Sequence, residues 1–367
     1  MITPRQFLRA LVALTAGVLS GFVSLSAFAA PPPGVLDETH ASVRAVMAAQ
    51  KEVTADWMRD ATVLGTAVGF DAAGNTALVV YVDQDSKNAG EVIRNLPRSH
   101  GGVAVQVELT EKFRAMAKPG GGGGTSHTAI QTPPIQLGTS GGWSKDLANG
   151  YCCGGTLGSL INIAGSQYIL SNYHVFEADI VSGGNNTVAT TGDPVIQPGL
   201  IDVNCTLANA QTVATLEVHH SLPNSNVDCS VAKVASGKVR TDGAILEIGT
   251  ISSSTVAASL NKAVKKSGRT TGLTRSSISG LNATVSIAYD NECAGGAAFT
   301  KTFTGQIVIA NNGSRFLNSG DSGSLMVEDV ATNPRAVGLL FAGSSSTAIA
   351  NPIGQVLSFL NATMVGN

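Results

Sequence analysis

Short runs of β-forming residues, separated by clusters of turn-forming residues, fill the last two thirds of this chain of 367 residues. From residue 128 onward Gly, Asn, Ser and Asp gather between the runs, as at residues 183–186. No long helical pattern appears before residues 352–360. Many short strands with frequent turns and one terminal helix are typical of an all-β barrel architecture. The expected strands are residues 156–163, 168–170, 213–218, 229–234, 264–267, 283–289, 306–310, 325–328 and 336–341.

A mixed pattern precedes this region. Apolar residues at helical spacing alternate there with β-rich runs, and the sequence Asp-Ala-Ala-Gly-Asn at residues 71–75 is a strong hairpin turn. We therefore expect a small α+β domain with one sheet and two helices. Its expected elements are helices at residues 37–58 and 86–96 and strands at residues 62–70, 76–82 and 103–109. His40 and His100 are isolated in this segment, which shows no catalytic constellation.

Composition divides the chain further. A charged start with Arg5 and Arg9, an apolar stretch and Ala-Phe-Ala at residues 27–29 predict a signal peptide over residues 1–29. Five consecutive glycines predict a flexible linker over residues 119–127. The expected order is therefore the signal peptide, the small α+β domain at residues 30–118, the linker, and the β-rich domain at residues 128–367. The small domain is expected to be a pro-region or an accessory module.

Charge and cysteine content exclude several kinds of partner. The net charge is −2 and only 13% of the residues are charged, so no basic patch favours nucleic acid. No later segment is apolar and long enough to span a bilayer, so we expect no membrane contact after signal cleavage and a secreted or periplasmic location. The five cysteines lack the paired CxxC spacing of zinc sites. We expect no metal and no other cofactor.

The chemistry of the chain is indicated by Gly-Asp-Ser-Gly-Ser at residues 320–324. A tight turn of small residues exposes a serine hydroxyl to a substrate carbonyl, but the hydroxyl needs a base and the base needs an orienting acid. His174 ends an apolar run and Asp228 follows a turn, in the order His, Asp, Ser of one known triad arrangement. The predicted catalytic residues are His174, Asp228 and Ser322. Taken singly, each could instead be a structural residue: a strand-end histidine, a turn-capping aspartate and a turn serine.

Further motifs at matching separations resemble the trypsin-like (chymotrypsin-fold) serine proteases, in particular the bacterial α-lytic and streptogrisin branch. Cys-Gly-Gly-Thr-Leu at residues 153–157, Ser-Gly-Arg-Thr-Thr-Gly at 267–272 and Gly-Leu-Leu-Phe-Ala-Gly-Ser at 338–344 carry the resemblance, which covers residues 128–360. Longer phrases at residues 197–202 and 351–353 resemble a bacterial group related to the plant Narrow Leaf 1 proteins. The resemblance implies two six-stranded antiparallel barrels, with His174 and Asp228 on the first barrel, Ser322 on the second and the active site between them.

The resemblance also implies roles for other residues. The N–H groups of Gly320 and Ser322 are expected to form the oxyanion hole. Phe316 and Leu317 are expected at the floor of the substrate pocket, and Gly343 at its open mouth. Because neither floor residue is charged, a small or apolar side chain is expected before the scissile bond.

Three further expectations follow from this resemblance. Asp321 should be buried and paired with Lys266 or Arg269. Cys205 is favoured as the disulfide partner of Cys152 or Cys153, because Val175 stands where the family usually has the partner cysteine. Phe341 stands where the family usually has a serine that supports the catalytic aspartate.

The resulting functional hypothesis is a secreted serine endopeptidase that hydrolyses peptide bonds through an acyl-enzyme. Its partner would be a protein or peptide substrate, and the N-terminal domain could contact the protease domain and be cut from it at the linker. Two alternatives stay open at this point. One is a catalytically weak binding module of the same fold, and the other is an esterase that uses the same triad.

Overall fold

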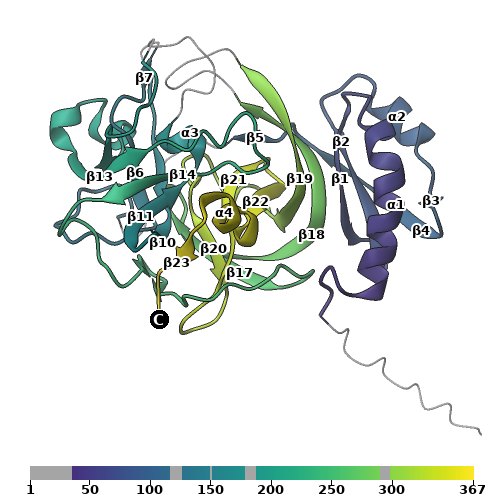
Figure 1. Cartoon of the computed structure of the whole chain (residues 1–367). Coiled ribbons are helices and arrows are strands. Elements are labelled where there is room, and N and C mark those ends of the chain that lie inside the picture. Colours follow the sequence, from purple (N-terminus) through teal and green to yellow (C-terminus); the bar gives the residue numbers. More distant parts are fainter. Residues whose placement is uncertain (1–34, 116–125, 149–150, 178–186, 290–297) are drawn as a thin grey trace, which may run out of the picture. The chain divides into compact units, whose positions relative to one another are not determined.

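The computed structural model of the chain describes residues 35–115, 126–148, 151–177, 187–289 and 298–367 (Figure 1). All of them belong to one compact unit, residues 35–367. The predicted signal peptide and residues 119–125 of the predicted linker lie outside the described residues. None of the helices among the described residues has the length and apolar character needed to cross a bilayer.

Residues 35–115 form the expected helices and strands to within a few residues, together with two short strands that were not expected. The hairpin turn closes as predicted, because the Asp71 carboxylate accepts the N–H groups of Ala73 and Asn75, each at 2.9 Å, and Gly74 adopts a positive φ of 84°. The elements are α1 (Ala41–Trp57), β1 (Val63–Phe70), β2 (Thr76–Asp83), α2 (Ala89–Asn95), β3 (Ser99–His100), β4 (Val103–Thr110) and β5 (Arg114–Ala115).

The rest of the described chain is mostly β, as expected. Its first part contains β6 (Thr139–Trp143), β7 (Leu147–Ala148), β8 (Tyr151–Cys152), β9 (Gly155–Leu157), β10 (Ser159–Ile163), β11 (Ser166–Ser171), α3 (Tyr173–Phe176), β12 (Pro194–Gln197), two 3-10 turns (Leu200–Val203 and Leu207–Asn209), β13 (Gln211–Glu217) and β14 (Ser230–Val234). Its second part contains β15 (Ala244–Ile245), β16 (Gly249–Thr250), β17 (Ala263–Gly268), β18 (Gly272–Tyr289), β19 (Phe299–Ala310), β20 (Leu325–Glu328), β21 (Ala336–Gly343), β22 (Thr347–Pro352), α4 (Ile353–Leu360) and β23 (Thr363–Met364).

The strands form two large sheets. The C-terminal sheet contains six strands paired in the order β17, β20, β21, β22, β19, β18, and a further antiparallel pairing of β17 with β18 closes them into a ring. The other sheet follows the order β23, β10, β11, β14, β13, β12, β6, β9, in which only Gly158 separates β9 from β10 along the chain. The expectation of two six-stranded barrels is thus confirmed in part, since a closing strand pair is present in the first of these sheets.

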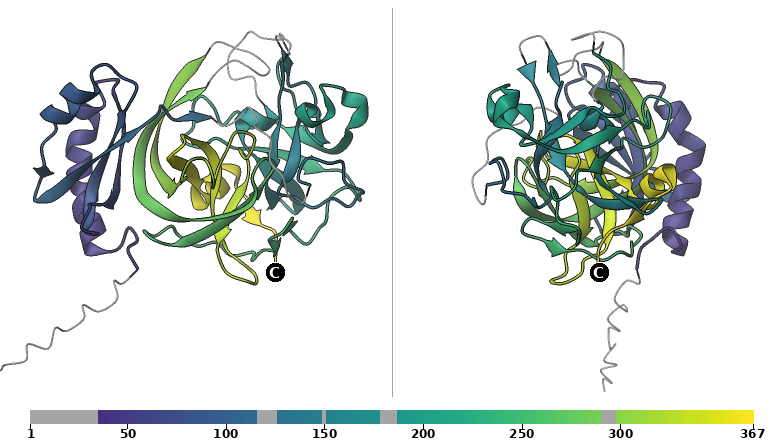
Figure 2. Two further views of the ribbon diagram at one scale, coloured as in Figure 1. Left: turned by 180° about the vertical axis from the view of Figure 1, so that it is seen from behind. Right: turned by 60° about the vertical axis from the view of Figure 1, so that its left-hand side comes forward.

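The hairpin of β18 and β19 is much longer than the sequence predicts. The expected strands were residues 283–289 and 306–310, whereas β18 has 18 residues and β19 has 12. The extra residues are polar and rich in Ser, Thr and Gly, so their sequence carries a weak strand signal. Partners on both sides make them strands, because β18 pairs with β17, β19 and β1. The long hairpin of β18 and β19 is drawn in green in Figures 1 and 2.

Residues 35–115 share a sheet and a core with the C-terminal ring. Strand β1 pairs antiparallel with β18, so β1, β2, β4 and β3 continue the same sheet. Val43 and Val46 of α1 belong to one buried cluster with Ile278 and Ile307 of the ring. This packing buries apolar surface common to both segments, which stabilises their association. The domain boundaries expected from composition stay a prediction.

Candidate active site

His174 and Asp228 meet because of the register of two neighbouring strands. In the antiparallel pair of β11 and β14, Ser171 lies opposite Ser230. The residues that follow β11 and those that precede β14 therefore emerge at the same end of the sheet. The chain turns there into the single helical turn α3, which carries His174. Strand pairing thus brings together two side chains that are 54 residues apart in the sequence.

The Asp228 carboxylate is fully buried and accepts hydrogen bonds at both oxygens. Its Oδ2 lies 2.6 Å from His174 Nδ1 and accepts the Tyr289 hydroxyl at 2.8 Å. Its Oδ1 accepts the backbone N–H groups of Tyr173 at 2.7 Å and of His174 at 3.4 Å. The backbone N–H of Asp228 donates to Asn351 Oδ1 at 2.9 Å. These contacts hold the carboxylate in one orientation against the imidazole.

The contact with Asp228 determines which imidazole nitrogen can act as a base. When Nδ1 carries the proton that it donates to the carboxylate, Nε2 of the neutral ring is an acceptor. His174 Nε2 is buried and has no hydrogen-bond partner among the described residues. A buried acceptor without a partner is costly in a folded protein, and such atoms are typical of functional sites. The ring is therefore arranged to take a proton from a group that enters the site.

Ser322 lies in the turn between Gly320 and Gly323, which both have positive φ values, 92° and 90°. A side chain at residue 323 would come within 2.2 Å of Ser171 Oγ, so the close approach of the turn to β11 requires glycine. Thr156 holds the turn from the other sheet: its N–H donates to the Ser322 carbonyl at 2.8 Å and its hydroxyl to the Gly320 carbonyl at 2.9 Å. The serine turn is thus attached to the sheet that carries His174.

The hydroxyl of Ser322 donates to the backbone carbonyl of Phe341 at 3.2 Å. No hydrogen bond joins it to the imidazole, since Nε2 has no partner in the described part of the chain. Within the same residues, the N–H groups of Gly320 and Ser322 donate to no acceptor in the protein. Two unused donors beside a serine hydroxyl can receive a developing oxyanion.

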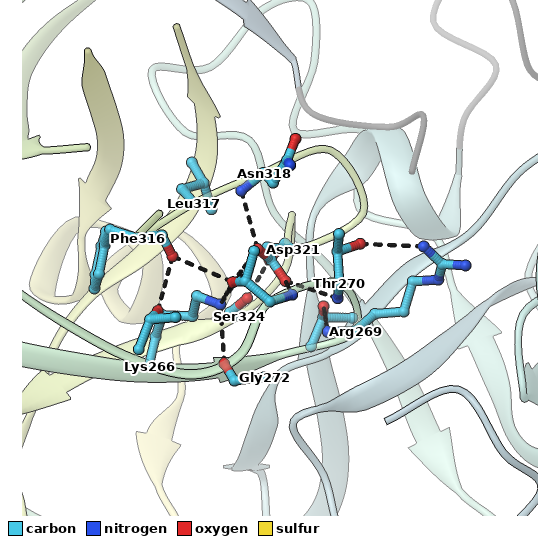
Figure 3. A network of polar contacts seen from close by, with 12 residues as sticks. Lys266, Arg269, Thr270, Gly272, Phe316, Leu317, Asn318, Asp321 and Ser324 are labelled. Carbon is cyan, nitrogen blue, oxygen red and sulfur yellow. Dashed lines mark hydrogen bonds and ion pairs between the residues drawn. The ribbon is translucent and has the colours of Figure 1, made fainter. Parts of the chain in front are cut away.

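Asp321 is fully buried and paired with Lys266, one of the two cations expected from the sequence (Figure 3). Lys266 Nζ lies 3.2 Å from Asp321 Oδ2, and its side chain is also fully buried. Burial lowers the pKa of Lys266, and the charge of Asp321 opposes that shift. Arg269, the other candidate, instead forms an ion pair with Asp202. The cation beside the serine turn is therefore supplied from within the chain.

Backbone and hydroxyl donors complete the surroundings of Asp321. Four hydrogen bonds reach its carboxylate besides the contact with Lys266. They come from the N–H groups of Thr270 at 2.9 Å, Thr271 at 3.1 Å and Asn318 at 3.0 Å, and from the Thr271 hydroxyl at 2.7 Å. A carboxylate with this many donors fixes the backbone of the turn that carries Ser322.

The residues expected in the substrate pocket are found in two different environments. The side chains of Phe316 and Leu317 are 1% and 0% exposed and belong to the hydrophobic cluster of the C-terminal ring. Their backbone N–H groups donate to Asn311 Oδ1, which explains how the loop is held. Gly343 instead lines a cavity of about 1050 Å³. The pocket role of Phe316 and Leu317 stays a prediction.

A strand from residues 35–115 occupies the edge of β21 beside the serine turn. Strand β5 pairs antiparallel with β21, with Arg114 opposite Gly343 and Ala115 opposite Ala342. Strand β21 also contains Phe341, whose carbonyl accepts the Ser322 hydroxyl. The extended segment β5 therefore pairs with β21, the strand that borders the candidate nucleophile.

Tyr289 is the functional candidate that sequence reasoning missed. It is the last residue of β18, and it reaches Asp228 only because the long β18–β19 hairpin carries it there. The available sequence signal was the apolar residue at every second position, since Ala283, Val285 and Ile287 share a face of the strand with Tyr289. Nothing local in the sequence indicated that this face approaches Asp228.

The cysteines and possible metal-ligating groups add three observations. Cys152 and Cys205 form a disulfide, one of the two pairings expected for Cys205. Cys229 is a free, fully buried thiol in the core, and burial, followed by the charge of Asp228, raises its pKa well above the ordinary value. Among the described residues, no group of three or more His, Cys, Asp or Glu side chains could hold a metal ion.

One family model matches part of this chain. A family model described as the Nal1 C-terminal domain matches residues 220–351, consistent with the resemblance to Narrow Leaf 1 proteins. Among curated proteins, none matches this chain.

Serine proteases are among the solved structures that resemble part of the chain. One is described as a glutamic acid specific serine protease that uses a histidine triad in substrate binding; it has 17% identity and a TM-score of 0.40, and the match covers 63% of this chain and 100% of that one. Thermobifida fusca Protease A has 18% identity and a TM-score of 0.40, with 64% and 99% covered. The Nocardiopsis protease has 17% identity and a TM-score of 0.38, with 61% and 97% covered.

Proposed function

We propose that this protein is a serine endopeptidase that hydrolyses peptide bonds through an acyl-enzyme. One observation carries the proposal: the buried hydrogen bond of 2.6 Å between His174 Nδ1 and Asp228, which leaves Nε2 without a partner among the described residues. A neutral imidazole with its acceptor nitrogen free can take the proton of a hydroxyl. Ser322 is the hydroxyl in the adjoining turn.

In the proposed reaction the Ser322 oxygen attacks the substrate carbonyl carbon as its proton passes to His174 Nε2. The Asp228 carboxylate stabilises the positive imidazolium and does not itself take the proton. The N–H groups of Gly320 and Ser322 stabilise the oxyanion of the tetrahedral intermediate, and each donor of this kind contributes about 3 kcal/mol. The imidazolium then protonates the leaving amine, and a water molecule hydrolyses the acyl-enzyme with His174 again as the base.

The edge of β21 supports a peptide over a simple ester as the substrate. Its residues Ala342 and Gly343 already pair with the extended chain at β5. An extended peptide that adds to a sheet edge is held by its own backbone groups, which an ester substrate lacks. Hydrolysis of an extended peptide is therefore the function that these contacts favour.

A second candidate is a binding module with weak or no catalysis. The hydrogen bond from Ser322 Oγ to the Phe341 carbonyl favours this reading, because the hydroxyl donates to that carbonyl and not to the imidazole. The hydroxyl would have to leave the carbonyl before it could donate to His174. Side chains change rotamers readily when a substrate enters, so this observation alone does not outweigh the His174–Asp228 pair.

Reaction with a fluorophosphonate probe tests the proposed function. We expect covalent labelling of the wild-type protein and of Ser253→Ala, a control that removes an exposed hydroxyl elsewhere. We expect none for Ser322→Ala. Absence of labelling in the folded wild-type protein would favour the binding module. Cleavage of the amide bond of a peptide would support an endopeptidase, whereas cleavage of the matching ester without cleavage of the peptide would support an esterase.

The proposal includes export and processing. Residues 1–29 would be removed as a signal peptide, and residues 30–118 would act as a pro-region or accessory domain before the protease domain. The pairing of β5 with β21 supports a role in covering the site. Mass spectrometry of the secreted protein tests both steps. Mature species that begin at residues 120–127 and disappear in Ser322→Ala would support self-processing, and one intact species starting near Ala30 in both proteins would exclude it.

A further inference from the structure

We propose that Tyr289 is a positioning residue, which orients Asp228 and through it the imidazole of His174. The inference rests on the proposed function. It starts from the hydrogen bonds that the buried carboxylate accepts. Two backbone N–H groups reach Oδ1, while Oδ2 lies 2.6 Å from His174 Nδ1 and accepts the Tyr289 hydroxyl at 2.8 Å. Tyr289 is thus the second side chain at the oxygen that holds the imidazole.

The direction of this contact matters for the orientation of the carboxylate. An ionised carboxylate only accepts hydrogen bonds, so the tyrosine must donate its proton. Two donors that approach one oxygen from different sides restrict rotation about the bond that joins the carboxylate to its side chain. Without the hydroxyl, the contact with His174 would be the only side-chain hydrogen bond to this carboxylate among the described residues.

The hydroxyl is held in a protonated state by its surroundings. Tyr289 is 4% exposed, and burial, followed by the charge of Asp228, raises its pKa well above the ordinary value. The phenol therefore stays a donor throughout the pH range in which a histidine acts as a base. A donor that does not titrate can support the carboxylate both before and after the imidazole takes up a proton.

Aromatic contacts fix the ring itself. The Tyr289 ring stacks on Phe299 with centroids 4.7 Å apart and an interplanar angle of 7°. It also lies edge-to-face with the His174 imidazole, with centroids 6.0 Å apart, and is tilted against Phe303 with centroids 6.5 Å apart. Tyr289 thus touches both members of the pair, through its hydroxyl and through its ring. Replacement by phenylalanine would keep the ring contacts and remove only the hydrogen bond.

The hydrogen bond from Tyr289 to Asp228 also connects the two sheets. Asp228 and His174 lie at the end of β11 and β14, whereas Tyr289 ends β18 of the ring that carries Ser322. The hydrogen bond therefore attaches the acid of one sheet to a strand of the other. It restricts movement of the His174–Asp228 pair relative to the serine turn, and proton transfer is sensitive to that distance.

The test compares Tyr289→Phe with Tyr168→Phe in the full chain. Tyr168 is the matched control, because it is 6% exposed and its hydroxyl donates to the Glu217 carboxylate at 2.8 Å, in a pair separate from the His174 and Ser322 contacts. We expect Tyr289→Phe to slow fluorophosphonate labelling of Ser322 by about tenfold to a hundredfold, the value of one hydrogen bond to a charged group. Tyr168→Phe should label at the wild-type rate. Equal rates for Tyr289→Phe and the wild type would overturn the inference.

A spectroscopic measurement separates orientation from a general loss of stability. The proton on His174 Nδ1 gives a resonance far downfield, and its position reports the hydrogen bond to Asp228. We expect this resonance to shift or broaden in Tyr289→Phe and to stay unchanged in Tyr168→Phe. A slower reaction with an unchanged resonance would contradict positioning. If the wild-type protein is not labelled at all, the proposed function fails, while the resonance still decides whether Tyr289 orients the pair.

Discussion

Replacement of Lys266 by methionine tests whether its buried ion pair with Asp321 stabilises the serine turn. The change keeps most of the side-chain volume and removes the cation that lies 3.2 Å from the Asp321 carboxylate. It also removes the donor that reaches the Gly272 carbonyl at 3.0 Å. Both members of the ion pair are fully buried, so no water replaces the lost charge directly. The carboxylate keeps its four other hydrogen bonds, from Thr270, Thr271 and Asn318.

The expected loss follows from these contacts. Removal of one partner of a buried ion pair costs about 3 to 5 kcal/mol of folding free energy, because it leaves an uncompensated charge. The remaining donors to Asp321 favour the lower end of that range, about 3 kcal/mol. Combining Lys266→Met with Asp321→Asn should cost less than the sum of the single changes, since the double variant contains no unpaired charge.

Urea unfolding followed by circular dichroism measures these differences. Lys265→Met is the matched control on the same strand, because Lys265 donates only to the Val330 carbonyl, at 2.7 Å, among the described residues. Its loss should be about 1 kcal/mol, the value of one ordinary hydrogen bond. Equal effects of Lys265→Met and Lys266→Met would refute the view that the buried pair stabilises the turn. Additive effects in the double variant would refute the coupling.

Three further predictions follow from other contacts. Arg114→Pro removes the N–H that β5 can offer to β21, so cleavage of an extended peptide should become several-fold faster than in Arg114→Ala; an unchanged rate would show that β5 does not cover the site. Cys152→Ser combined with Cys205→Ser opens a link between residues 53 apart and should lower the free energy of unfolding by about 4 kcal/mol; thermal unfolding with and without reductant measures it, and a loss below about 1 kcal/mol would contradict it. Burial raises the pKa of Cys229, so the folded thiol binds its proton more tightly than the unfolded one. The free energy of unfolding relative to Cys229→Ala should therefore be constant below about pH 8.5 and fall as the pH rises above it, and equal pH profiles of the two proteins would contradict this.

Several features of the fold and of the candidate site were predictable from local sequence. Two turns were predictable from the sequence: the serine turn at residues 320–323 and the hairpin turn at residues 71–75. Both depend on neighbouring residues, through positive φ values at glycine and side-chain hydrogen bonds to the nearby backbone. The order of His174, Asp228 and Ser322 indicated a triad type. The pairing of Asp321 with Lys266 was also among the expectations, because Lys266 and Arg269 both lie in the stretch that carries the family resemblance.

Other features depended on contacts between distant segments. Pairing between strands that are far apart in the sequence determines three of them: the length of β18, the pairing of β1 with β18, and the pairing of β5 with β21. The hydrogen bond from Tyr289 to Asp228 joins residues 61 apart and depends on where a curved hairpin ends. Sequence by itself determined the strand-rich composition, the turns and the residue types of the site, because these reflect local backbone and side-chain chemistry. Tertiary structure alone decided which side chain supports Asp228 and which strand covers β21, because these follow from the packing of whole sheets.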